Sequence, residues 1–354
     1  MKETKKRTFS WLLILVMVFS VISPGSVWKA SAEKAYDGYV YVTVERFTLG
    51  QGFAEEPVKL GYYKEDTLED ILKRNLGNKM IYVNSTYGAY FNGYVDGGEP
   101  KGWTSEKIPE KIRQALSKKG VTISGRANAK ELSGGDYTGE SAFMLCVDNA
   151  GANMGMSGIV YSDAAKTETT YHNGSVIRIE YGIYNWSDDL NISYSTPMIA
   201  FANKDDLIKK VADYKGDEAD SAYANAIATL EDWDATTKEV ENAGTKLTEA
   251  EKKPVTTTIR NVKSSQKKQI KVTWKKKSSV TGYQIQVSTS SKFKKSKTKT
   301  YNVKKAKTTS KTIKSLNSKK KYYVRIRTYK KTKENGKNVT RYSNWSGKKS
   351  VKVK

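Results

Sequence analysis

The chain has 354 residues, of which 62 are Lys or Arg and 37 are Asp or Glu, so its formal net charge is +25. A single Cys and a single His exclude an internal disulfide and the usual zinc clusters of Cys and His ligands. The charge is uneven, because the last 101 residues hold 32 basic side chains and one acid, Glu334. This asymmetry predicts a modular protein in which one module faces an anionic partner or water.

Residues 1–32 have the pattern of a secretory signal peptide. Basic residues between Lys2 and Arg7 precede an apolar run from Trp11 to Ile22, and Ala30-Ser31-Ala32 supplies small residues for cleavage. The run is too short for a membrane span, which takes about 20 residues. We therefore expect a secreted chain, extracellular or associated with the cell wall, with no transmembrane segment after cleavage. So little Cys in a secreted chain is typical of the surface of a Gram-positive bacterium.

The segment 33–203 predicts an α+β domain. Alternating apolar residues indicate a strand over 39–44, and a second strand follows over 58–63. Residues 66–70 then open an amphipathic helix that Gly77 ends. Two strands followed by a helix are how a β-grasp fold begins. Further expected elements are one helix and two strands, over 105–119, 142–147 and 175–184.

Several motifs in this segment resemble an uncharacterised domain of secreted bacterial proteins, which is itself similar to the C-terminal β-grasp domain of transcobalamin. They are Val44–Gly52, Ile108-Pro109, Val121–Arg126 and Asn173–Arg178. The resemblance implies a β-grasp-like domain of unknown function and suggests a corrinoid-like small ligand. In transcobalamin, however, a larger partner domain completes the site.

The chain departs from this family at two places. It has Ser141-Ala142-Phe143-Met144 where the family often has Ser-Gly-Trp-Met, and Asn185–Leu190 replaces a Gly-rich ending. These losses weaken any transfer of ligand contacts from the family.

Aromatic side chains in a Gly-rich stretch form the candidate ligand site of this domain. Exposed rings on a loop can stack on sugar rings or on a flat cofactor. The alternative is a loop that folds its rings back onto its own core. The candidate ligand-binding residues are Tyr87, Tyr90, Phe91, Tyr94 and Trp103, with Asn149 and Trp186 from later stretches.

No catalytic residue, metal site or cofactor is predicted. His172, the only His, lies in a polar turn. Glu55 and Glu56 lack the apolar neighbours expected of an acid/base pair. Asp188-Asp189 falls short of the roughly 6–8 oxygen ligands that calcium takes. We therefore expect the protein not to be an enzyme.

The segment 204–253 predicts a small bundle of three short helices. Leu207 and Val211 keep helical spacing, as do Ile227 and Leu230, and a capping box over 236–239 starts the last helix. This segment resembles the helical spacer repeats of bacterial surface proteins, and we expect it to separate two modules.

The segment 254–354 predicts an all-β sandwich. Alternating strands cover 270–274, 283–287 and 322–328. Trp274 sits where a fibronectin type III domain keeps its core Trp, and Leu316 with Tyr322 matches the tyrosine corner of that fold. Residues 342–346, Tyr-Ser-Asn-Trp-Ser, resemble the start of its last strand. The whole segment therefore resembles a fibronectin type III domain.

The lysines of this segment fall mostly in turns or on outward positions. Lys outnumbers Arg, which favours diffuse attraction over bidentate recognition. The expected signal peptide argues against nucleic acid and for an anionic cell-wall polymer or glycan. The alternative is solubility, because Lys also protects strand edges from aggregation. The candidate anion-binding residues are Lys275, Lys276, Lys277, Lys294, Lys295, Lys319 and Lys320.

These observations predict a non-catalytic, secreted or cell-surface binding or adhesion protein. The β-grasp-like domain would hold a ligand, and the basic domain would lie near the wall. Two alternatives stay open: a protein that binds a corrinoid-like small ligand, and an accessory part of a secreted carbohydrate-active system.

Overall fold

The computed structural model describes most of the chain. The expected signal peptide, Tyr87 and Trp186 lie outside the described residues. Among the described residues, no helix is both long enough and apolar enough to cross a membrane. The described ranges are 35–86, 88–95, 103–123, 130–152, 155–164, 166–167, 169–183, 202–218, 220–334 and 336–354.

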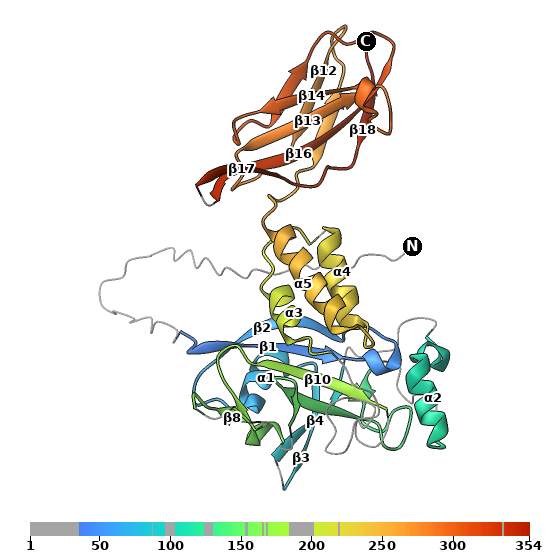
Figure 1. The fold of residues 1–354 in the computed structure, drawn as a ribbon, viewed down its shortest axis with the longest axis vertical. Helices are drawn as coiled ribbons and strands as arrows, with labels where there is room; N and C mark the ends of the chain where they lie inside the picture. Colours follow the sequence, from blue (N-terminus) through green and yellow to red (C-terminus); the bar gives the residue numbers. More distant parts are fainter. Residues whose placement is uncertain are drawn as a thin grey trace, which may run out of the picture. The chain divides into compact units, whose positions relative to one another are not determined.

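A five-stranded mixed sheet is the centre of the first domain (Figure 1). Strand β1 is antiparallel to β2 on one side and parallel to β10 on the other, and β10 is antiparallel to β6. Among the described residues, the last strand of the domain therefore lies beside the first. In sheet order the strands are β2 (Glu55–Tyr62), β1 (Gly38–Glu45), β10 (Val176–Gly182), β6 (Ala142–Val147) and β7 (Ala150–Gly151).

One face of this sheet carries the main hydrophobic core. Val40, Val42 and Val44 alternate along β1 and share a buried cluster with helix α1 (Leu68–Leu76). Thr67 caps the start of the helix: its side chain accepts a hydrogen bond from the Asp70 amide, and the Asp70 carboxylate accepts one from the Thr67 amide. The cap and the apolar stripe together place α1 across the sheet.

Helix α2 (Glu110–Lys118) is shorter than the helix we expected over 105–119. A 3-10 turn over Ser105–Lys107 precedes it, and Ile108 between them has an extended backbone with ψ 132°. Pro109 explains the break, because a proline disfavours the helical conformation of the residue before it. The expected stripe is buried all the same, through Ile108 together with two residues of α2, Ile112 and Leu116.

A small sheet and several short strands complete this domain. The small sheet contains β3 (Met80–Ser85), β4 (Gly88–Tyr94) and β5 (Leu132–Ser133). Two-residue strands β8 (Val160–Tyr161) and β9 (Thr170–Tyr171) pair in parallel.

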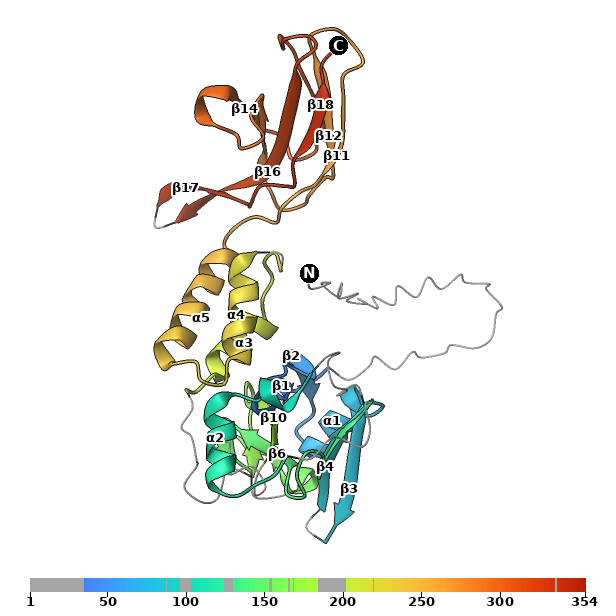
Figure 2. The same ribbon diagram turned by 90° about the vertical axis from the view of Figure 1, so that its right-hand side faces the viewer.

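Helix α3 (Asp205–Ala212) packs on the other face of the central sheet. Helices α4 (Ser221–Glu231) and α5 (Thr237–Glu251) pack against α3 and against each other. Leu207 and Ile208 of α3 share a buried cluster with Tyr41 of β1 and Val176 of β10. Figure 2 shows these helices and α1 on opposite sides of β1. The helical segment thus shares a core with the sheet.

The last segment folds as a β-sandwich of two sheets. One holds β11 (Ile259–Lys263), β12 (Ile270–Trp274) and β15 (Ser310–Ile313). The other holds β14 (Thr298–Val303), β13 (Gly282–Ser288), β16 (Lys321–Glu334), β17 (Lys337–Tyr342) and β18 (Lys349–Lys352).

The core of the sandwich contains the residues that the sequence pattern selected. Trp274 is fully buried beside Tyr283. The Tyr322 hydroxyl accepts a hydrogen bond from the Asn317 backbone at 3.1 Å, which closes the predicted tyrosine corner.

Candidate functional site

The predicted aromatic site is spread between core and surface. The stretch expected to be a Gly-rich loop contains strand β4, so successive side chains point to opposite faces. Phe91 and Tyr94 are 4 % and 0 % exposed, while Tyr90, the residue before Phe91, is 38 % exposed. Trp103 is half-buried, and its indole N–H donates to the Leu49 carbonyl at 2.7 Å. Phe91, Tyr94 and Trp103 therefore follow the alternative of rings folded onto the core, and Tyr90 is the exposed ring.

Asn149 has a local conformational role. It follows Asp148 in the two-residue turn between β6 and β7, and both have positive φ, 48° and 64°. That pair of left-handed residues is the conformation that a tight β-hairpin requires, and Asp and Asn tolerate it better than most residues.

Ser175, His172 and Asp148 have the residue types of a catalytic triad but not its geometry. The Ser175 hydroxyl donates to Asp148 Oδ2 at 2.8 Å and lies 2.9 Å from His172 Nδ1. The carboxylate lies 3.5 Å from the same nitrogen. In a triad, the His contacts the nucleophile and the acid through different ring nitrogens. Ser175 is also fully buried. The contacts among the three side chains connect the turn before β10 to the β6–β7 hairpin.

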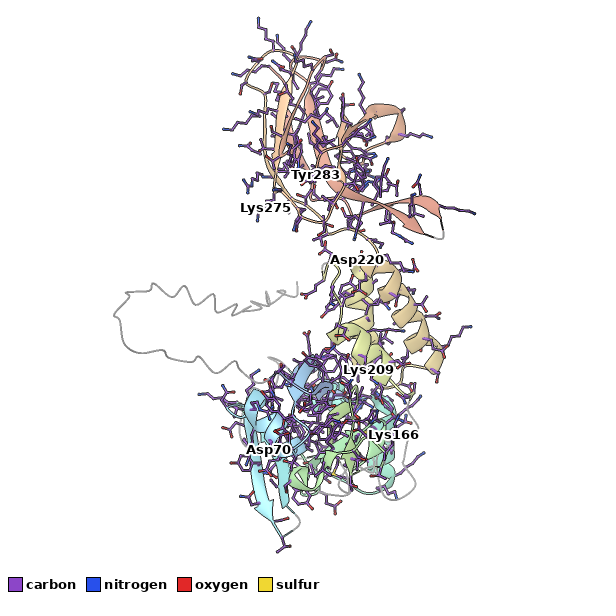
Figure 3. All side chains as sticks on the ribbon, turned by 90° about the vertical axis from the view of Figure 1, so that its left-hand side faces the viewer. Asp70, Lys166, Lys209, Asp220, Lys275 and Tyr283 are labelled. Carbon is purple, nitrogen blue, oxygen red and sulfur yellow. The ribbon has the colours of Figure 1, made fainter. Side chains whose placement is uncertain are left out.

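A groove of about 710 Å³ lies next to this turn. Its volume is within the range of small-molecule sites. It is lined by the β6–β7 turn, residues 166–167, α3 and α5. Its lining includes lysines at 166, 209 and 210 and carboxylates at 148, 205, 206 and 241. Figure 3 labels Lys166 and Lys209. The mixed charge gives the groove no single preference for an anion or a cation.

A buried layer of charge lies between the sheet and the helices, and the sequence did not predict it. The Arg178 guanidinium is bound by Glu45 and lies 2.9 Å from Glu180 Oε1, and all three side chains are less than a tenth exposed. Lys204, just before α3, is also buried and donates to the carbonyls of Leu230 at 2.9 Å and Asp232 at 2.5 Å. The alternating sequence pattern of strand β10 placed Arg178 and Glu180 on the same face. It did not show that helices cover that face.

Burial shifts several ionisation equilibria in this layer. It raises the pKa of Glu180 to about 7 and that of Asp205, the first residue of α3, to about 6. Burial, followed by the Arg178 charge, lowers the pKa of Lys204 to about 8. A cavity of about 20 Å³ beside these groups has room for about one water molecule. The layer therefore binds sheet to helices and leaves no space for an organic ligand.

The seven predicted anion-binding lysines come from three separate turns of the sandwich. Six are exposed and Lys277 is half-buried. Among the described residues, none of the seven ammonium groups has a carboxylate within ion-pair distance. Figure 3 shows side chains extending outward around this domain, with Lys275 labelled, whereas the labelled Tyr283 belongs to the core. The domain thus has a cationic surface with almost no internal neutralisation.

Comparison with known proteins identifies the sandwich. Residues 254–341 match the fibronectin type III domain family, so the chain contains a fibronectin type III domain, as Trp274 and Tyr322 predicted. The match covers this part of the chain alone, and comparison with curated proteins gave no match.

Several solved structures match about a quarter to a third of this chain. One contains the FN1–FN3 domains of chicken CNTN1, with 20 % identity over 29 % of this chain and 31 % of that chain, and a TM-score of 0.23. Another is the fn3 domain of the human collagen alpha-1(XX) chain, with 13 % identity over 29 % of this chain and 87 % of that chain, and a TM-score of 0.23. A third is a beta-1,2-glucanase from Parabacteroides distasonis, with 17 % identity over 28 % of this chain and 12 % of that chain, and a TM-score of 0.21.

Proposed function

We propose that the protein is a secreted, non-catalytic binding or adhesion protein that is held at an anionic cell-wall polymer by its fibronectin type III domain. The observation that carries this proposal is the charge of that domain, 32 basic side chains against one acid in residues 254–354. Fibronectin type III domains commonly serve as binding or adhesion modules. The signal-peptide pattern of residues 1–32 supports an extracellular location.

The chemistry of these cations favours a polymer over a compact ligand. Lysines on separate turns act as point charges and attract an anion without fixing its orientation. Their attraction adds up along a chain of negative charges and is screened beyond about 10 Å at 0.1 M salt. A long polyanion at low or moderate ionic strength is the partner that such a surface binds best.

Retention on cell-wall preparations tests this proposal. The purified chain is applied to walls with and without their anionic polymer and eluted with a salt gradient. We expect retention at low salt, release before about 1 M salt, and little retention on stripped walls. A variant with the substitutions Lys275→Gln, Lys276→Gln, Lys319→Gln and Lys320→Gln should elute at lower salt than the wild type. No retention at low salt, or retention that 1 M salt does not reverse, would contradict the proposal.

For the first domain, we propose a β-grasp fold with a ligand-binding role. The order of its sheet supports the fold, because a β1–β2 hairpin leads into α1 and the final strand β10 then inserts parallel to β1. The transcobalamin-like motifs point to the same fold.

A small ligand in the groove beside α3 is the second candidate function. The volume of about 710 Å³ favours it, and the ligand suggested by the resemblance is a corrinoid. Titration of the chain with a corrinoid and with haem, followed by absorbance, tests it. Saturable binding that weakens on Lys209→Glu would support the groove, and a flat titration would remove this candidate.

A further inference from the structure

Two arginines on the outer face of the fibronectin type III domain alternate with aromatic rings. Arg325 and Arg327 lie on β16 and point away from the core residues Val324 and Ile326. The Arg325 guanidinium carbon is 4.2 Å from the Phe293 ring centroid and 4.4 Å from that of Trp345. We call Arg325, Arg327 and the rings of Phe293, Trp345 and Tyr342 the arginine ladder.

The second arginine continues the same stack. The Arg327 guanidinium carbon is 4.4 Å from the Trp345 centroid and 3.9 Å from that of Tyr342. Trp345 thus contacts both guanidinium groups. Stacking on rings fixes the planes of the guanidinium groups, as cation–π contacts do.

Glutamines on the neighbouring strand fix the same groups from the side. Gln286 faces Arg325 and Gln284 faces Arg327 in the β13–β16 register. Each Gln side-chain oxygen accepts two hydrogen bonds, at 2.9 and 2.7 Å, from the Nε and Nη2 atoms of its Arg. The Gln amide nitrogens in turn donate to Thr300 and Asn302 of β14. Each guanidinium is therefore oriented without being neutralised.

Neither ladder arginine has an anionic partner among the described residues. Their hydrogen-bond acceptors are neutral amides, and burial lowers the pKa of both groups with no carboxylate opposing it. A guanidinium has five N–H donors, and each Gln uses two of them. The remaining donors are suited to a two-oxygen contact with phosphate, which is the geometry that guanidinium matches best.

We propose that the arginine ladder is the site at which this domain binds successive phosphates of a linear phosphodiester polymer. This proposal rests on the polyanion binding proposed above and names its chemistry. Residues two apart on a strand are separated by about 7 Å. A polymer with a glycerol-sized spacer between its phosphates has a comparable repeat, so neighbouring phosphates can meet Arg325 and Arg327 together. The surrounding lysines supply the unspecific attraction.

Binding to poly(glycerol phosphate) tests the ladder, measured by calorimetry with the full chain at several salt concentrations. Polygalacturonate, whose charges are carboxylates, is the comparison polymer. Arg325→Lys with Arg327→Lys keeps both charges and removes the guanidinium forks. Lys275→Gln with Lys276→Gln removes two charges from an exposed turn and leaves the ladder intact.

We expect the Arg-to-Lys variant to bind poly(glycerol phosphate) about tenfold more weakly or worse, since charged hydrogen bonds are lost. The Lys-to-Gln variant should lose about twofold and reduce the salt slope by about 1–2. Circular dichroism and a melting curve establish that each variant is folded. If the Arg-to-Lys variant unfolds, the single variant Arg325→Gln is compared with Lys275→Gln in the same binding measurement.

The outcomes separate this proposal from the one on which it rests. If the wild-type chain binds neither polymer, both proposals fail. If it binds and the folded ladder variant binds as tightly as the wild type, the ladder has a structural role only and diffuse charge explains the affinity. Tighter binding to polygalacturonate than to poly(glycerol phosphate) would overturn the assignment to phosphodiesters.

Discussion

Arg178 and Glu45 meet through two parallel hydrogen bonds, from Nε to Oε1 at 3.0 Å and from Nη2 to Oε2 at 2.7 Å. They belong to the two neighbouring parallel strands at the middle of the sheet. Both side chains are buried, so neither charge can be solvated by water if its partner is lost.

Replacing Arg178 by Met should therefore destabilise the protein strongly. Glu45 and Glu180 would be left as two buried carboxylates without their cation, at a cost of about 3–5 kcal/mol. Urea unfolding followed by circular dichroism measures the change. Lys64→Met is the control, because the Lys64–Asp163 pair, at 2.9 Å, is exposed and screened by water, so its loss should have a far smaller effect. Equal effects for the two variants would show that the buried pair is not essential.

The stability of the protein should depend on pH through Glu180. Burial raises its pKa from 4.5 to about 7, so between these values the folded state keeps a proton that the unfolded state has released. The contribution of this group to stability is present below about pH 4.5 and is lost as the pH rises to 7. Glu180→Gln removes this loss.

The free energy of unfolding of Glu180→Gln, relative to the wild type, should thus increase from pH 5 to pH 8, by an amount on the order of 1–3 kcal/mol. Denaturant titrations at each pH measure the difference. Asp205→Asn should show the same increase relative to the wild type over a lower pH range, because burial raises the pKa of Asp205 to about 6. A difference that stays constant across this range would contradict the assignment.

Cys146 should be unreactive while the sheet and helices stay together. It faces Arg178 across β6 and β10, it is 0 % exposed, and burial raises the pKa of its thiol well above the usual value. The reactive thiolate is therefore both rare and covered. A thiol reagent at pH 8 should label the native protein very slowly and the urea-unfolded protein at once. Rapid labelling without denaturant would show that this interface opens readily.

The tyrosine corner should contribute measurably to the fibronectin type III domain. Tyr322→Phe removes the hydroxyl that accepts the Asn317 N–H and should cost about 1 kcal/mol. Tyr323→Phe is the matched control, because this neighbour is half-buried and its hydroxyl has no hydrogen bond among the described residues. A similar loss for both variants would mean that the corner bond is not responsible.

The sequence predicts those features that depend on local pattern. Capping boxes at Thr67 and Thr236 start the expected helices, and Trp274 is the core residue of the predicted sandwich. Features that depend on distant partners were missed. Arg178 could be located on a face of its strand, but its partner Glu45 is 133 residues away and the helices that cover it come later in the chain.

The candidate sites show the same division. Whether an aromatic ring is exposed depends on the conformation of its segment, and a stretch expected as a loop contains a strand that turns Phe91 inward and Tyr90 outward. The arginine ladder required knowledge of which strands pair, because Gln284 and Gln286 are far from Arg325 and Arg327 in the chain. The cationic character of the domain, which depends on composition alone, was evident from the sequence.

The parallel pairing of β1 with β10 has a consequence for biosynthesis. β1 is made first, yet its second neighbour in the sheet exists only after residues 176–182 have been translated. Long-range parallel pairing is slow, since a large loop must close before any contact repays the entropy. We therefore expect the nascent domain to stay open along one edge of β1 until β10 has been made, and to fold late, as one unit.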